Sequence, residues 1–343
     1  MARERGGMTP TLAPTSATSA APSPAPTRTR GLLRAVAVVS CLPYLTLKVA
    51  WIAGSRTGIP DGSVLLDHRV AMAVGNGLTV LLDSCVIVLA LVLSRPWGLR
   101  VPARPLAFPV WVATGLLAPI MVGFPLQLLT QALGGGTATA SGPGHEPFLH
   151  SWVFAVVYTG FIVQGLALGT LFALYARDRW GHLWRGRVWE LPVAVVGTRY
   201  KAVAVAAAVL APFPLAVRLY WACGGTAGLG AAAERTVDFR VLDGMHVALL
   251  LVAVAGTLLL AFRRARILPV TVPLATNWVC SGAAACWGGW LLLAALLPSD
   301  DPADRPALLM TLTYAGQMTV GLLLASVGAH FLARRSATAR TRP

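Results

Sequence analysis

Apolar residues are arranged along this chain in eight long runs, which are separated by short polar segments rich in arginine. A bilayer core of about 30 Å needs about 20 helical residues at about 1.5 Å per residue. Only a helix satisfies all backbone hydrogen bonds within one lipid-embedded segment. The pattern therefore predicts an all-α transmembrane protein. The eight predicted spans are 32–53, 70–93, 108–132, 151–176, 202–223, 244–262, 272–297 and 309–333.

The composition agrees with lipid as the solvent. Hydrophobic residues make up 56% of the chain, charged residues only 12%, and the mean hydropathy is +0.68. So few charges do not cover the surface of a soluble protein of this size. The net charge is +15, but the basic residues lie between the apolar runs. That placement favours topology signals and contact with anionic lipid headgroups over nucleic-acid binding.

The basic residues also predict an orientation. Of the 28 Lys and Arg residues, 21 lie in the segments that share a side with the two termini, and five lie in the segments on the other side. Cytoplasmic loops carry the excess of Lys and Arg. We therefore expect a plasma-membrane protein with both termini in the cytoplasm.

Two segments of the first half recur in the second half with the same spacing, which indicates an internal duplication. The first pair is Leu45-x-x-Lys48-x-x-Trp51-x-x-Gly54-x-x-x-Gly58 and Leu215-x-x-Arg218-x-x-Trp221-x-x-Gly224-x-x-x-Gly228, offset by 170 residues. The second pair is Tyr158-x-Gly160-x-x-x-x-Gly165-Leu166 and Tyr314-x-Gly316-x-x-x-x-Gly321-Leu322, offset by 156 residues. Because four spans are an even number, both halves should have the same orientation. The prediction is an eight-helix bundle of two tandem parallel-oriented four-helix repeats.

The same pattern divides the chain into five parts. Residues 1–30 are rich in Ala, Pro, Thr and Ser, and such a segment is typical of a disordered tail. The segment between the halves alternates Arg with Trp, which favours a short helix in the cytoplasmic headgroup layer. The predicted parts are a tail at 1–30, a first half at 31–176, a linker at 177–201, a second half at 202–333 and a basic tail at 334–343.

Lys48 and Arg218 are cations that occupy matching positions in the repeat, each beside a tryptophan. An ionisable side chain within a span is costly and marks a candidate functional site. Two interpretations fit this pair. The two cations form an outward-facing anion site between the halves, or each extends to the outer headgroups with its tryptophan as an interface anchor.

Asp83 is the only carboxylate deep in a predicted span, and its counterpart region in the sixth span is apolar. In hydrocarbon such a group is either protonated or paired with a cation or polar neighbour. A proton- or cation-coupled transporter uses a carboxylate of this kind. A structural hydrogen bond to a neighbouring helix explains it equally well.

Three histidines, His68, His150 and His246, begin predicted spans on the outer face. Histidine suits zinc, copper or haem iron, so these residues are candidate metal or haem ligands. The alternative is a set of solvated residues at helix starts. In that case Asp67 and Asp243 are helix caps favoured by the helix dipole.

The sequence offers little evidence for an enzyme. It contains no phosphate-binding loop, no dinucleotide-binding motif, no HExxH and no GxSxG. The five cysteines show no metal-binding spacing and are typical of small apolar packing residues.

The segments Pro43-Tyr44-x-x-x-Lys48-x-x-Trp51-x-x-Gly54 and Gly115-Leu116-Leu117-Ala118-Pro119 resemble a family of multi-pass membrane proteins of high-GC actinobacteria. That resemblance carries no assigned activity. The architecture is also similar to that of the haem A synthases, which place histidine haem ligands on alternate helices of two four-helix halves. His68, His150 and His246 match three such positions, but the eighth span has no histidine near its outer end.

We therefore expect a multi-pass membrane protein with a transport-like or scaffolding role that uses Asp83, Lys48 or Arg218. A haem- or metal-dependent membrane oxidoreductase is the alternative, and a regulatory partner protein is a third class.

Overall fold

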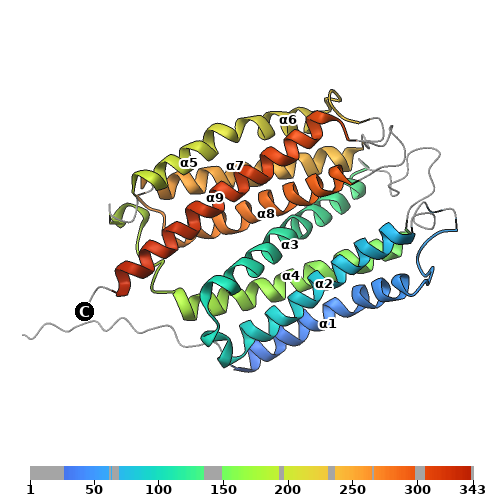
Figure 1. Cartoon of the computed structure of the whole chain (residues 1–343), viewed down its shortest axis with the longest axis horizontal. Coiled ribbons are helices and arrows are strands. Elements are labelled where there is room, and N and C mark those ends of the chain that lie inside the picture. Colours follow the sequence, from blue (N-terminus) through green and yellow to red (C-terminus); the bar gives the residue numbers. More distant parts are fainter. Residues whose placement is uncertain are drawn as a thin grey trace, which may run out of the picture.

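The structure is a computed structural model that describes residues 27–61, 63, 69–134, 149–192, 197–230, 236–264, 266–297 and 306–340. Long helices make up most of the described chain (Figure 1). They are α1 (Thr27–Ile52), α2 (Arg69–Ser94), α3 (Ala103–Ala132), α4 (Ser151–Trp180), α5 (Thr198–Leu210), α6 (Pro212–Ala222), α7 (Val237–Phe262), α8 (Thr271–Leu296) and α9 (Leu308–Arg340). Two 3-10 helices, η2 (Pro96–Arg100) and η3 (Val188–Glu190), lie in the connections.

Eight helical segments of the described chain are long and apolar enough to cross a membrane, and they match the eight predicted spans. This supports a multi-pass membrane protein. The fifth segment, Thr198–Ala222, combines α5 and α6. Pro212 begins α6, and a proline there removes a backbone donor and interrupts the helix. The three prolines of α3, by contrast, are accommodated within one helix.

The helices form two groups, with α3 between them (Figure 1). Helices α1, α2 and α4 pack together, and α5 to α9 form the larger group. Helix α3 packs mainly against α8, and the two helices approach closely at Gly115 and Gly282. A methyl group added to Gly115 would lie 2.5 Å from the Gly282 backbone. Small residues therefore join the two groups.

Two tryptophans fix this crossing. Trp111 of α3 donates to the hydroxyl of Ser281 at 3.3 Å. Trp287 of α8 donates to the carbonyl of Leu116 at 3.1 Å. The contact between α3 and α8 thus has a hydrogen bond on each side of the glycine pair.

The turns that follow α1 and α6 have the same backbone geometry. Gly54 and Gly224 have φ values of 91° and 94°, which only glycine adopts readily. The indole of Trp51 donates to the carbonyl of Thr57 at 2.7 Å. The indole of Trp221 donates to the carbonyl of Ala227 at 3.1 Å. Each pair of equivalent residues is 170 positions apart, the offset of the first sequence match.

The linker differs in part from the prediction. Helix α4 continues to Trp180, and within the described residues 181–192 the regular structure is the short 3-10 helix η3 rather than an interfacial α-helix. Arg335 of α9 donates to the carbonyls of Leu183 and Arg185 at 2.8 and 3.0 Å. Arg263 donates to the Trp189 carbonyl at 2.7 Å. These side chains attach the linker to α9 and to the end of α7. Helix α9 also continues to Arg340, so most of the predicted basic tail is helical.

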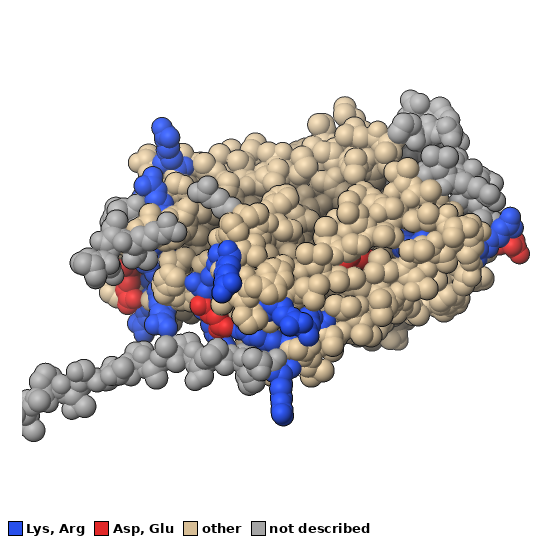
Figure 2. Space-filling view, turned by 60° about the horizontal axis from the view of Figure 1, so that its bottom comes forward, with Lys and Arg blue, Asp and Glu red and all other residues tan. Residues whose placement is uncertain are grey.

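Charged side chains gather at one end of the molecule. Figure 2 shows most of the visible Lys and Arg at the end where α1 begins and α9 ends, and a mostly uncharged surface along the middle. At that end Arg30 of α1 forms an ion pair with Asp178 of α4. The predicted separation between a basic end and an apolar middle is therefore present in the fold.

Candidate functional site

A cavity of about 620 Å³ lies within the first four spans. Its wall is mostly apolar and aromatic, and it includes residues of α1, α2, α3 and α4 together with Trp287 and Trp290 of α8. Along α2 it extends from Thr79 to Leu89, which is about 15 Å at 1.5 Å per residue. A cavity of this size holds a small organic molecule.

The cavity opens on the side of the bundle. Phe108 of α3 and Trp290 of α8 line it and are 66% and 38% exposed, and the lining residue Cys85 of α2 is also exposed. All three lie within the candidate spans. In a bilayer this opening would face lipid.

Asp83 is buried in the wall of this cavity, with 5% of its surface exposed. The amide of Gln164 on α4 donates to Asp83 Oδ1 at 3.4 Å, a long hydrogen bond. Asp83 Oδ2 is buried and accepts no hydrogen bond from the described residues. The predicted interhelical bond is present, and the other carboxylate oxygen has no hydrogen-bond partner among the described residues.

Lys48 lines the same cavity, nearer the end of α1. Its ammonium group donates to Asn76 Oδ1 of α2 at 2.7 Å. It also lies over the rings of Tyr44 and Trp51, 4.9 and 5.0 Å from their centroids. Such contacts stabilise a partly desolvated cation. The lysine is thus held by contacts within the protein.

The two charged groups are separated along α2. Asn76, the partner of Lys48, precedes Asp83 by seven residues, or about 10.5 Å along the helix. Seven residues are two turns, so both side chains lie on one face of α2. The structure therefore brings Lys48 and Asp83 to one cavity, with Lys48 toward the end opposite the basic end of the bundle.

In the first half α3 packs less closely on α4 than α8 packs on α9 in the second half. Gly165 of α4 faces the side chain of Met121 on α3, and a methyl group added there would lie 2.4 Å from the Met121 sulfur. The glycine 156 positions later, Gly321 of α9, instead faces the backbone of Ala285 on α8, also at 2.4 Å. A methionine side chain therefore separates the helices in the first half, where a backbone contact joins them in the second.

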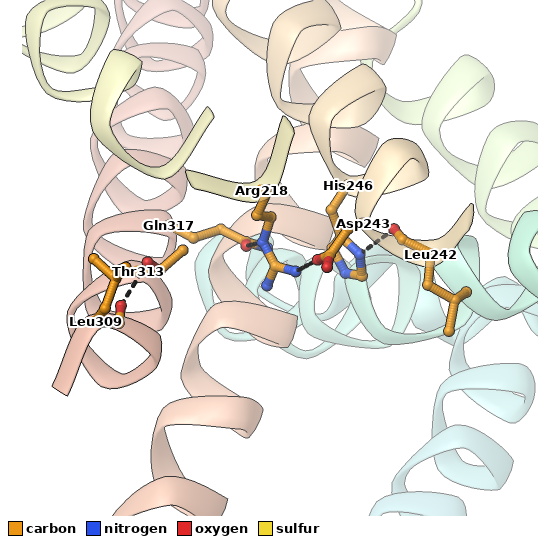
Figure 3. Close-up of polar contacts among 7 residues, drawn as sticks. All are labelled: Arg218, Leu242, Asp243, His246, Leu309, Thr313 and Gln317. Atoms are coloured by element: carbon orange, nitrogen blue, oxygen red, sulfur yellow. Dashed lines mark hydrogen bonds and ion pairs between the residues drawn. The ribbon is translucent and has the colours of Figure 1, made fainter. Parts of the chain in front are cut away.

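Arg218 occupies the position equivalent to Lys48 but has a different environment (Figure 3). It is 4% exposed and forms a buried ion pair with Asp243 of α7. Its Nε donates to Gln317 Oε1 of α9 at 2.5 Å. Each cation thus binds partners in its own half, and the structure does not bring Lys48 and Arg218 together as one anion site.

Asp243 is not the helix cap that the sequence suggested. Helix α7 begins at Val237, and Thr236 is the cap, because its hydroxyl accepts from the Phe239 amide at 3.2 Å. Asp243 therefore lies nearly two turns inside the helix. Its ion pair with Arg218 was not predicted from the sequence, although both residues stand out as charges within or beside apolar runs.

The three candidate histidine ligands have different positions. His246 is buried on α7, with Nδ1 2.8 Å from the Leu242 carbonyl and its ring edge-on to Trp287. His150 is exposed and occupies the cap position of α4. His68 lies outside the described residues. Among the described residues no three His, Cys, Asp or Glu side chains are grouped to hold a metal ion. The metal or haem site stays a prediction.

No protein-family model matches the chain. Comparisons with curated proteins and with solved structures give no significant match. The resemblances to an actinobacterial membrane family and to the haem A synthases therefore stay predictions, and the function is argued from the geometry of the site.

Proposed function

We propose that this chain is a transport-like membrane protein whose first four-helix half binds a solute in the cavity at Asp83. The observation that carries this proposal is the buried carboxylate with one unpartnered oxygen in the wall of a 620 Å³ apolar cavity. Leaving a buried polar atom without a partner costs free energy, about 1–3 kcal/mol or more for a charged group. Such sites concentrate where ligands bind.

In this proposal the second half is a rigid scaffold. Arg218, which matches Lys48 in the sequence, is already paired with Asp243. Helices α8 and α9 are in close backbone contact. The four-helix duplication is part of the proposal. It is supported by the two sequence matches and by the shared turn geometry after α1 and α6.

The proposed orientation places the basic end of the bundle, with both termini, in the cytoplasm of a plasma-membrane protein. The excess of Lys and Arg at that end supports it. The cavity with Lys48 would then lie toward the outer leaflet. Reporter fusions near residue 190 test the orientation, since an exterior location of that linker would contradict it.

A ligand-stabilisation assay tests the cavity. Purified protein is heated with a panel of amphiphilic cations, anions and neutral solutes, and the midpoint of unfolding is measured. A ligand at 100 times its Kd adds about 2.7 kcal/mol to the free energy of unfolding, which corresponds to a rise of several degrees. We expect at least one class to stabilise the wild type.

Filling the cavity supplies the control. Ala113 lines it, so Ala113→Phe should occupy it and abolish the stabilisation. Ala206→Phe places the same side chain on the exposed face of α5 and should leave the stabilisation unchanged. If no solute stabilises the wild type, or if Ala113→Phe is stabilised to the same extent, the proposed cavity function is wrong.

A further inference from the structure

The cavity also indicates what class of solute it accepts, and this inference rests on the proposed function. Its wall is mainly hydrocarbon and aromatic rings, and its opening lies within the spans. A strongly hydrated solute would lose its water there with little compensation. The ligand therefore needs an apolar body that partitions into lipid before it enters.

The charged residues in the cavity wall indicate the sign of the ligand's charge. The Lys48 ammonium already has a 2.7 Å bond to Asn76 and two aromatic faces around it. Asp83 has a single long bond on Oδ1 and none on Oδ2 among the described residues. Asp83, rather than Lys48, therefore has an unused hydrogen-bond acceptor.

Aromatic rings lie close to that anion. Phe161 precedes Gln164, the partner of Asp83, by three residues on α4, so the two share a face of the helix. Tyr44 packs edge-to-face against Phe161 with their centroids 4.8 Å apart. Both rings line the cavity. A carboxylate beside aromatic faces is the usual environment for an organic cation.

We propose that the cavity binds a monovalent lipophilic cation, whose charge lies beside Asp83 and whose apolar body fills the aromatic cavity. Lys48 and Asp83 already balance each other, so a bound cation leaves one net positive charge in a low-dielectric site. That favours cations whose charge is spread or shielded by apolar groups over compact, strongly hydrated ammonium ions.

Tetraphenylphosphonium and tetraphenylborate provide a matched test, because the two ions have nearly the same size and shape and opposite charge. Binding of each is measured by equilibrium dialysis against the purified full-length protein in detergent, with protein-free micelles as the blank. We expect saturable binding of tetraphenylphosphonium. Asp83→Asn should weaken it about tenfold or more, since it removes a charge-assisted contact. Asp83→Glu should retain part of it, and Lys48→Met should leave it unchanged or tighten it.

Three results would overturn the inference. Equal tetraphenylphosphonium affinity in wild type and Asp83→Asn would show that the cation does not bind beside the carboxylate. Tighter, Lys48-dependent binding of tetraphenylborate would assign the cavity to anions and leave the proposed function intact. Binding of neither ion would also reject a lipophilic cation. If in addition no solute in the panel responds to Ala113→Phe, the proposed function fails with it. Size-exclusion profiles of each variant show whether it remains folded.

Discussion

The two matching sequence segments each place a cation just before the same type of turn, and the two cations have different partners. In the first half Lys48 binds a neutral asparagine at the edge of an open cavity, and a carboxylate two helical turns further along α2 keeps an unpartnered oxygen. In the second half Arg218 forms a buried ion pair with Asp243. Two segments with the same sequence spacing thus place a cation in two settings: one near a carboxylate with an unpartnered oxygen, the other in a buried ion pair.

Helix packing at two matched glycines differs as well. Gly165 and Gly321 occupy equivalent places, yet the first faces a flexible methionine and the second faces backbone. A methionine side chain thus lies against the helix at Gly165, whereas backbone lies against it at Gly321. Trp287 and Trp290 of α8 also line the cavity, so its wall is not built from the first four spans alone.

The largest expected effect is the loss of the buried ion pair. Arg218→Met leaves Asp243 buried without its cation, which should cost about 3–5 kcal/mol and reduce the yield of folded protein. Lys48→Met should cost about 1 kcal/mol, because its partner is neutral and the lysine is partly exposed. Thermal unfolding of both variants in the same detergent measures the difference. Equal losses of stability would contradict the division into a rigid and an open half.

An intermediate effect is expected at the equivalent glycines. Gly321→Ala forces a methyl group against the Ala285 backbone and should cost about 1–3 kcal/mol. Gly165→Ala meets the end of the Met121 side chain, which can move aside, so the cost should stay below about 1 kcal/mol. Alanine gains helix propensity at both sites, so the difference between the variants is the informative quantity. A larger loss for Gly165→Ala would reject the role assigned to Met121.

The smallest expected effect on stability is that of Asp83→Asn. Asparagine keeps an acceptor for Gln164 and removes a buried charge that lacks a full set of partners. The free energy of unfolding should change by less than about 1 kcal/mol while ligand stabilisation is lost. Chemical denaturation of ligand-free protein checks the first statement. A loss as large as that of Arg218→Met would make Asp83 a structural residue.

The sequence predicts the spans well because length and hydropathy are local properties, and it identifies Lys48 and Asp83 because charges stand out in apolar runs. It misplaces Asp243 because the polar residues Asp238 and Arg240 hide the true start of α7. It does not predict the cavity, since that depends on how closely α3 approaches α2 and α4 across the fold. The pairing of Arg218 with Asp243 is equally a product of helix packing.

Infrared difference spectroscopy of the carboxyl groups tests the central claim most directly. The spectrum of the protein is recorded with and without the solute that stabilises it most. We expect a ligand-induced change in a carboxyl band that disappears in Asp83→Asn. A difference spectrum without any carboxyl change, or one whose carboxyl band persists in Asp83→Asn, would contradict it.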